Sequence, residues 1–182
     1  VDYAHQSGVV HRDLKPDNVF LANATPGAAM QVKLLDFGIS KIDGRASLTR
    51  TGQVLGTPRY MAPEQLRGED DLDARVDVYA LGVILYEALA GAPAFPAQQP
   101  SELILSILNG RIVPLRALRP DIGQELEGVV QRAMSKTREA RYQSAIELAE
   151  AWFAVVHRDD GPKGVRVGVA TLPGVAGTLN LA

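Results

Sequence analysis

Residues 11–18 read His11-Arg12-Asp13-Leu14-Lys15-Pro16-Asp17-Asn18, a polar run that separates two short apolar segments. Its proline and its density of polar side chains predict a loop. Strand candidates follow at residues 19–21 and 32–35, and a turn-rich stretch at residues 23–29 joins them. The pattern predicts a small antiparallel hairpin that begins directly after the polar loop.

Two further motifs follow the polar loop along the chain. Asp36-Phe37-Gly38 stands at the end of the second predicted strand. Ala62-Pro63-Glu64 comes later, directly after the stretch Gly56-Thr57-Pro58-Arg59-Tyr60-Met61. Asp-Phe-Gly alone would carry no weight, but chance rarely produces three such motifs in this order and at this spacing.

Together the three motifs resemble the catalytic loop, the metal-binding loop and the end of the activation segment of protein kinases. The resemblance covers about residues 1–156 and is to the C-terminal lobe of eukaryotic-like, bacterial serine/threonine protein kinases. It implies a mainly α fold, a kinase-like C-lobe in which a helical bundle accompanies a small β-hairpin that carries the catalytic and metal-binding loops. It also implies an enzyme that transfers the γ-phosphate of ATP to protein hydroxyls.

The resemblance gives the polar residues of these motifs their roles. Asp13 resembles the catalytic base that accepts the proton of the substrate hydroxyl, and Lys15 stands where a cation reaches the transferring phosphate. Asn18 and Asp36 resemble the magnesium ligands, and their amide and carboxylate oxygens are hard donors of the kind that Mg²⁺ prefers. We therefore expect ATP and Mg²⁺ as cofactors, bound through Lys15, Asn18 and Asp36.

The same resemblance implies a substrate class and a mode of regulation. Lys15 and Thr57 are typical of serine/threonine kinases, in which the hydroxyl of Thr57 would bond the catalytic aspartate and position the substrate. In similar kinases Arg12 binds a phosphate on the activation loop through charge-assisted hydrogen bonds. Thr49 and Thr51 are the predicted phosphosites. The implied partners are protein substrates with serine or threonine hydroxyls, and a second copy in autophosphorylation in trans.

Three more residues are expected to have architectural roles. Asp77 begins a stretch that resembles the central buried helix of kinases, where this aspartate accepts backbone hydrogen bonds from the catalytic loop. A carboxylate in so apolar a helix must be satisfied, because an unpaired buried charge is very costly. Glu64 and Arg141 resemble an ion pair that ties the activation-segment end to the last helices. We expect His5 to be a surface or packing residue only.

Helical patterns fill much of the chain after the activation segment. Residues 75–90 are apolar almost all round, which predicts a buried helix, and Gly91 ends it. Further helices are predicted at residues 1–7, 101–108, 126–134 and 144–156, and Ser144-x-x-Glu147 predicts a capping box at the start of the last one. Residues 36–64 lack apolar periodicity and are predicted to form a long loop. We therefore divide the chain into a partial kinase domain, residues 1–157, and a flexible tail or linker, residues 158–182.

Composition excludes several classes of function. The net charge is −2, from 19 basic and 21 acidic residues, so the chain lacks the basic balance typical of nucleic-acid binding. It has no cysteine, which excludes disulfides and thiolate metal sites. It contains no uninterrupted apolar run long enough for a membrane span. We expect a cytoplasmic domain, which the full-length protein could still anchor to a membrane.

Parts of a working kinase are missing from the sequence. It contains neither a G-x-G-x-x-G loop nor a lysine before the catalytic loop. We therefore expect an N-terminal lobe upstream of residue 1, negligible activity for the chain alone, and an exposed apolar surface near Phe37 and the hairpin. The alternative is a non-catalytic, kinase-like protein-interaction module, although such a module has no need of Asp13, Asn18 and Asp36.

Overall fold

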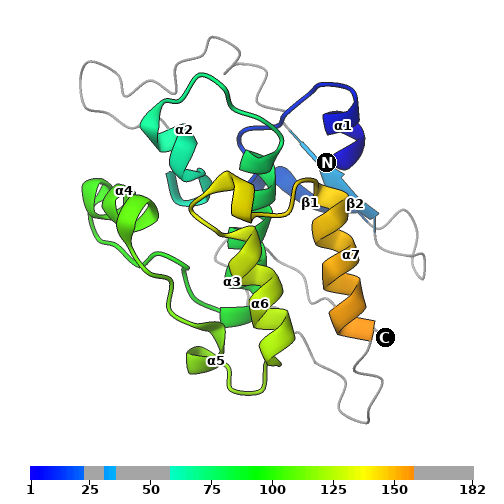
Figure 1. Cartoon of the computed structure of the whole chain (residues 1–182). Helices are drawn as coiled ribbons and strands as arrows, with labels where there is room; N and C mark the ends of the chain where they lie inside the picture. Colours follow the sequence, from blue (N-terminus) through cyan, green and yellow to red (C-terminus); the bar gives the residue numbers. More distant parts are fainter. Residues whose placement is uncertain (23–30, 36–57, 158–182) are drawn as a thin grey trace.

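The computed structural model describes residues 1–22, 31–35 and 58–157 of the chain, which are mostly helical (Figure 1). In chain order the elements are α1 (Asp2–Gln6), the 3₁₀ helix η1 (Pro16–Asn18), β1 (Val19–Ala22), β2 (Gln31–Leu34), the 3₁₀ helix η3 (Pro58–Tyr60), α2 (Pro63–Arg67), α3 (Arg75–Ala90), α4 (Pro100–Asn109), α5 (Leu115–Leu118), α6 (Gln124–Ala133), the 3₁₀ helix η4 (Arg138–Ala140) and α7 (Ala145–Val156). The predicted helices and hairpin are all present.

The hairpin holds the predicted catalytic loop at its base. β1 and β2 are antiparallel, and Val19 pairs with Leu34 in the register. The N–H of Leu35 donates to the carbonyl of Asn18 at 2.9 Å, so the pairing continues one residue beyond the strands. The end of the second strand is thereby fixed beside the last residue of the polar loop. This base lies close to α1 and one end of α3 (Figure 1).

Helix α3 runs through the middle of the helical part and is buried on nearly every side (Figure 1). It contacts α5, α6, α7 and η3, which together cover it. Its core side chains are Val76, Val78, Tyr79, Val83, Tyr86 and Leu89. Complete burial of one such aliphatic side chain stabilises a fold by about 1.5–3 kcal/mol, so the packing of α3 contributes several kcal/mol to stability.

A glycine in α3 allows the close approach of α6. A Cβ atom added at Gly82 would lie 2.8 Å from the Cβ of Ala133 and 2.9 Å from the side chain of Met134. Such distances are shorter than real contacts, so any larger residue would push the two helices apart. The close packing of α3 against α6 therefore depends on the absence of a Cβ atom at Gly82 as well as on the apolar side chains.

The predicted loop over residues 36–64 is wrong at its end. Residues 58–60 form η3, and Pro63 begins α2. These elements are too short to show helical periodicity in sequence, and a proline in the first turn of α2 is compatible with a helix start, since its missing N–H would be unsatisfied there. The short helices α5 and η4 were missed for the same reason of length. The predicted tail, residues 158–182, lies outside the described residues.

The capping box predicted at the start of α7 is present in one half. The hydroxyl of Ser144 accepts the N–H of Glu147 at 3.1 Å. The carboxylate of Glu147 instead accepts the N–H of Gln143, one residue before the cap, at 2.7 Å. Both donors at this helix start are satisfied, which stabilises the first turn of α7.

Lys136 connects the end of α4 to the segment that follows α6. Its Nζ donates to the carbonyl of Ile107 at 2.5 Å and lies 4.6 Å from the centre of the Phe95 ring. Burial, assisted by the charge of Arg141, lowers the pKa of Lys136 from 10.5 to about 8. The folded protein therefore binds this proton less tightly than the unfolded chain.

This lowered pKa predicts a pH-dependent stability. Between pH 8 and 10.5 the unfolded chain binds more protons than the folded protein at this lysine, so the lysine favours folding increasingly as the pH rises. We expect the free energy of unfolding of wild type, relative to Lys136→Met, to rise over this range in urea titrations. Lys33→Met, at an exposed lysine of β2, should show no such trend. A difference that stays constant with pH would contradict the prediction.

Candidate active site

The polar loop between α1 and β1 brings a carboxylate and a cation together. Leu14, 2% exposed, fixes the middle of the loop in the interior. On either side of it, Asp13 and Lys15 remain partly exposed, and Lys15 Nζ lies 3.0 Å from Asp13 Oδ2. The loop thus presents a proton acceptor and a positive charge toward solvent, at hydrogen-bond distance from each other.

Asn18 closes the same loop from inside. Its Nδ2 donates to the carbonyl of Asp13 at 2.8 Å, and the residue is buried. With the amide nitrogen used in this way, Oδ1 is the atom left to act as a ligand, and a neutral amide oxygen suits Mg²⁺. The residues that the structure describes contain no cluster of three metal-binding side chains. The second predicted ligand, Asp36, lies outside them.

Asp77, near the start of α3, holds the backbone of the loop through its carboxylate. Its two carboxylate oxygens accept the N–H of His11 at 2.8 Å and the N–H of Arg12 at 2.9 Å. These are the backbone hydrogen bonds that were expected of this aspartate. Burial makes each bond to the charged oxygen strong, because water does not compete for it.

His5 also contacts Asp77, which the sequence analysis did not foresee. The Nε2 atom of His5 lies 2.7 Å from Asp77 Oδ2, and the imidazole is 7% exposed. The other ring nitrogen, Nδ1, is buried and has no hydrogen-bond partner among the described residues. His5 and Asp77 are 72 residues apart, so no local pattern links them. His5 therefore makes a polar contact with Asp77 in addition to packing in the interior.

The predicted catalytic loop, residues 11–18, contains one residue with a strained backbone. Arg12 has a φ of 62°, in the left-handed region that residues with a Cβ rarely adopt. Its N–H is held by Asp77, and its carbonyl accepts a hydrogen bond from Gln65 of α2 at 3.0 Å. Gln65 is a second residue of the site that the sequence analysis missed.

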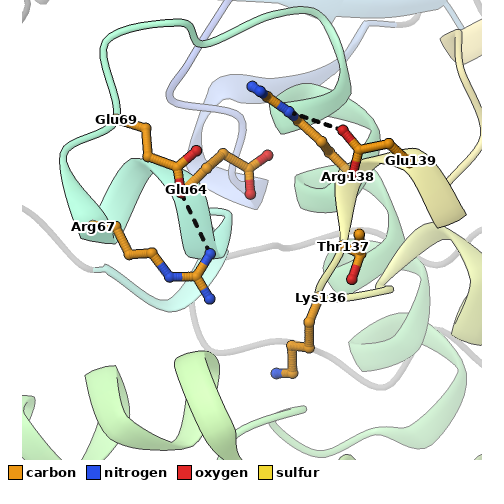
Figure 2. Close-up of a pocket in the computed structure, with 7 residues that line it drawn as sticks. All are labelled: Glu64, Arg67, Glu69, Lys136, Thr137, Arg138 and Glu139. Atoms are coloured by element: carbon orange, nitrogen blue, oxygen red, sulfur yellow. Dashed lines mark hydrogen bonds and ion pairs between the residues drawn. The ribbon is translucent and has the colours of Figure 1, made fainter.

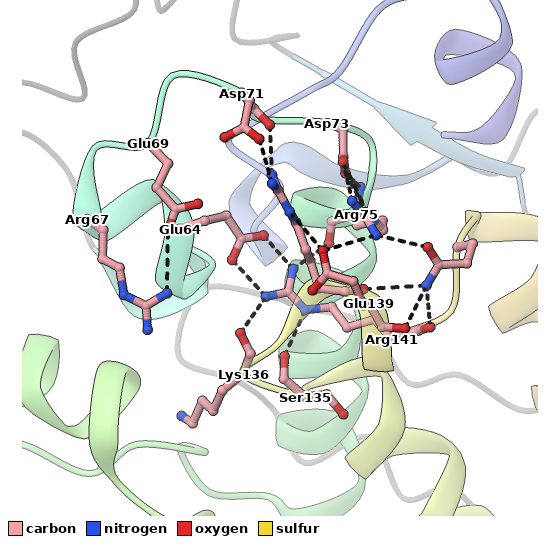
Figure 3. A network of polar contacts seen from close by, with 12 residues as sticks. Glu64, Arg67, Glu69, Asp71, Asp73, Arg75, Ser135, Lys136, Glu139 and Arg141 are labelled. Carbon is pink, nitrogen blue, oxygen red and sulfur yellow. Dashed lines mark hydrogen bonds and ion pairs between the residues drawn. The ribbon is translucent and has the colours of Figure 1, made fainter.

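Glu64 and Arg141 form the expected ion pair. Both nitrogen ends of the Arg141 guanidinium contact the Glu64 carboxylate, at 2.6 and 2.7 Å, and both side chains are almost fully buried. The guanidinium also donates to the carbonyls of Arg75, Ser135 and Lys136 (Figure 3). Each nitrogen of the buried guanidinium therefore donates a hydrogen bond. The ion pair connects α2 to the segment between α6 and α7.

Two more exposed ion pairs surround this buried pair, and they contribute less to stability. Arg138 lowers the pKa of Asp71, and Arg75 lowers the pKa of Asp73, in each case chiefly through a side-chain hydrogen bond. The side chain of Asp71 is 69% exposed and that of Asp73 is 42% exposed. Exposed ion pairs contribute about 0–1 kcal/mol, so these contacts orient the connection between α2 and α3 more than they stabilise it.

A polar hollow of about 300 Å³ lies beside the buried ion pair (Figure 2). The residues that line it are Glu64, Arg67, Glu69, Lys136, Thr137, Arg138 and Glu139. Arg67 lies 3.5 Å from Glu69, and Arg138 lies 3.2 Å from Glu139. None of the residues given a catalytic role lines it, and its arginines already have acidic partners. The hollow is therefore separate from the predicted phosphate site.

Glu87 is a buried acid that the sequence analysis did not single out. It lies in α3 and accepts the hydroxyl of Tyr60 at 2.8 Å, while Arg59 lies 3.7 Å away. Burial, together with the hydrogen bond to Glu87, raises the pKa of Tyr60. Tyr60 comes two residues before Ala62, so this contact fixes the approach to α2 on the central helix.

The structure thus brings together some of the predicted site residues and does not describe others. Asp13, Lys15 and Asn18 form one group, and Arg12 and Asp77 support it from behind. Glu64 and Arg141 form their own pair. The remaining predicted residues, Asp36, Thr49, Thr51 and Thr57, lie outside the described residues, as does Phe37.

None of the helices in the described part of the chain has the length and hydropathy needed to span a bilayer.

Comparison with known proteins supplies a family. Residues 1–153 match the model of the protein kinase domain. Serine/threonine-protein kinase PknB of Mycobacterium tuberculosis is 38% identical over 169 residues, which are 92% of this chain and 26% of that protein. Tyrosine-protein kinase MasK of Myxococcus xanthus is 45% identical over 143 residues, 79% of this chain and 21% of that protein. Serine/threonine-protein kinase PknH of Mycobacterium bovis is 38% identical over 180 residues, 97% of this chain and 29% of that protein. The chain therefore spans less than a third of each of these relatives.

Proposed function

The chain belongs to the protein kinase domain family, of the bacterial, eukaryotic-like kind, and we propose that within its full-length protein it transfers the γ-phosphate of ATP to serine and threonine hydroxyls of other proteins. One observation carries the proposal furthest. Asp13 and Lys15 lie 3.0 Å apart, and the amide of Asn18 is bonded to the carbonyl of Asp13. This group combines a proton acceptor, a phosphate-binding cation and a metal ligand in one loop.

The chemistry needs little more from the protein than position and charge. The carboxylate of Asp13 accepts the proton of the attacking hydroxyl. The ammonium of Lys15 stabilises the negative charge of the transferring phosphoryl group, and before that it keeps the Asp13 carboxylate oriented. Both side chains are partly exposed, so a protein substrate can reach them.

Asn18 and Asp36 are the residues proposed to hold magnesium, which when bound would neutralise charge on the ATP phosphates. The fit of Asn18 is supported by its orientation, because its Nδ2 is occupied by the Asp13 carbonyl. Asp36 directly follows Leu35, whose N–H is bonded to the carbonyl of Asn18. This tether supports a shared ion, since it keeps the chain beside Asn18 one residue before Asp36.

We further propose that residues 1–157 form the C-terminal lobe of the kinase domain, that residues 158–182 are a tail or linker, and that this domain is cytoplasmic. The Gly-rich loop and the strand lysine would come from another lobe. Phe20, Val32 and Leu35 of the hairpin region are exposed apolar residues, which supports a contact with such a lobe.

Regulation by phosphorylation is part of the same proposal. A phosphate on Thr49 or Thr51 would bind Arg12, and the hydroxyl of Thr57 would position the substrate beside Asp13. The phosphates would be added by a second copy of the protein, in trans. The left-handed backbone of Arg12, held by Asp77, supports a defined direction for the arginine side chain.

The type of hydroxyl that this protein phosphorylates is the point on which two of the relatives differ. One is named a serine/threonine-protein kinase and another a tyrosine-protein kinase. Lys15 favours serine and threonine, as the resemblance implies. We expect the full-length protein with ATP and Mg²⁺ to label serine and threonine peptides at least about tenfold faster than matched tyrosine peptides. Analysis of the phosphorylated amino acids in an autophosphorylated sample provides the independent readout.

Each other outcome excludes part of the proposal. Labelling confined to tyrosine would overturn the substrate class but keep the kinase. No labelling of any hydroxyl, with a folded protein, would leave the non-catalytic interaction module as the better description.

A further inference from the structure

The peptide group that joins Arg12 to Asp13 is held at both ends by side chains. The N–H of Asp13 donates to Nδ1 of His11 at 3.3 Å. The carbonyl of Arg12 accepts from Nε2 of Gln65 at 3.0 Å. This peptide directly precedes the side chain of Asp13, so its orientation decides where the carboxylate lies.

The contact of His11 is consistent with a single tautomer. Its Nε2 lies 3.2 Å from the carbonyl of Leu35, which can only accept, so the proton belongs on Nε2. The other nitrogen, Nδ1, is then the acceptor that the N–H of Asp13 needs. The carbonyl side of the peptide, however, depends on Gln65, which lies 53 residues away in the chain.

Gln65 uses both ends of its amide. It is 7% exposed. Its Oε1 accepts the N–H of Ala62 at 2.9 Å, while its Nε2 donates to the carbonyl of Arg12. A glutamine amide accepts and donates at once without a charge at any pH, whereas the carboxyl group of a glutamate of the same length can do so only when it is protonated. Ala62 belongs to the motif that ends the predicted activation segment, so one side chain contacts both that end and the catalytic loop.

Capping of α2 does not explain the second hydrogen bond. The bond from the N–H of Ala62 to Gln65 Oε1 satisfies a donor at the helix start, and a residue that only accepts would be sufficient for it. The bond to Arg12 goes to a residue whose backbone is strained, with a φ of 62°. A strained conformation persists only where its surroundings hold it.

We propose that Gln65 is a positioning residue of the kinase, which transmits the folded state of the activation-segment end to Asp13 through the Arg12 carbonyl. The inference rests on the function proposed above. Loss of the bond frees the Arg12–Asp13 peptide to rotate, and Asp13 then samples orientations in which it cannot accept the substrate proton. We expect the effect on kcat, because Lys15 and Asn18, the described residues proposed to hold ATP and magnesium, do not hydrogen-bond to Gln65.

Two variants of the full-length protein separate the two hydrogen bonds. Gln65→Met removes both bonds at similar volume. Gln65→Glu keeps an acceptor for the N–H of Ala62 but, when ionised, has no proton to donate to Arg12. We expect each to lower kcat about tenfold at pH 8.5, with KM for ATP within about twofold of wild type. Gln131→Glu, the same change at an exposed site of α6, is the matched control.

A pH series provides a readout that a purely structural role would not move. Burial raises the pKa of a carboxyl group, and the protonated carboxyl of the Gln65→Glu variant could again donate to the Arg12 carbonyl. The kcat of Gln65→Glu relative to wild type should therefore recover from pH 8.5 to pH 6, whereas the ratio for Gln65→Met should stay low. Melting temperatures are measured in parallel, and rates are taken well below the lowest of them.

The outcomes are distinct. Wild-type kcat in Gln65→Met would overturn the inference while leaving the kinase function intact. A loss of kcat accompanied by a fall of more than about 10 °C in the melting temperature of both variants would make Gln65 a structural residue and would also overturn it. An inactive wild-type protein would remove the proposed function, and this inference with it.

Discussion

Replacement of Asp13 with asparagine is expected to lower kcat of the full-length protein by about 10²- to 10⁴-fold, the usual contribution of a positioned proton acceptor. Asparagine has nearly the same size and keeps an oxygen that can accept a hydrogen bond from the ammonium of Lys15. In the wild type this ammonium lies 3.0 Å from the Asp13 carboxylate. It cannot accept the proton of a substrate hydroxyl. The loss should therefore appear in the rate of phosphoryl transfer, measured with saturating ATP and peptide, and not in the folded structure.

Asp70→Asn is the matched control for this variant. Asp70 is an exposed aspartate in the connection between α2 and α3, so the same change of charge should leave kcat within about twofold of wild type. A melting temperature of Asp13→Asn close to that of wild type would show that the variant is folded. If Asp13→Asn turned over as fast as Asp70→Asn, Asp13 would not be the base.

The largest expected loss of stability comes from Arg141→Met. This change leaves the Glu64 carboxylate buried without its partner, and breaking a buried pair in this way costs about 3–5 kcal/mol. The three backbone carbonyls that Arg141 contacts would lose a donor at the same time. We expect the midpoint of urea unfolding to fall accordingly, with little change in the slope of the transition.

Arg67→Met gives the comparison with an exposed pair. Arg67 and Glu69 lie 3.5 Å apart at the surface, where a pair contributes about 0–1 kcal/mol. The double variant Glu64→Gln/Arg141→Met should lose less than the sum of the two single variants, because neither charge is then left alone. Equal losses for Arg141→Met and Arg67→Met would refute the structural role assigned to the buried pair.

The elements that could be predicted were those whose signal is local. The hairpin, α3 and the start of α7 each follow from residues within one or two turns of one another, through alternation, apolar periodicity or a cap. Short elements such as α2 and η3 carry too few residues for a periodic signal and were predicted as loop. Their positions depend on contacts instead, such as that of Tyr60 with Glu87.

For the candidate site, the motifs identified Asp13, Lys15 and Asn18 because their order along the chain is itself the signal. The ion pair of Glu64 with Arg141 was expected from the resemblance, and the structure contains it. His5 and Gln65 were not foreseen. Nothing in their neighbourhood marks them, since their partners Asp77 and Arg12 are 72 and 53 residues away.

The sequence by itself determined the family, the order of the chemical groups and most of the helices. Neighbours along the chain are enough for these, because backbone preferences and side-chain spacing act over a few residues. Only the tertiary structure decided the buried polar contacts that no motif marks, those of His5 with Asp77 and of Gln65 with Arg12. A buried donor or acceptor needs some partner, but packing of the whole core selects the partner that lies within hydrogen-bond distance. That selection connects α2 to the peptide before Asp13, and it connects α1 and α3 to the loop through Asp77, which accepts the N–H of Arg12.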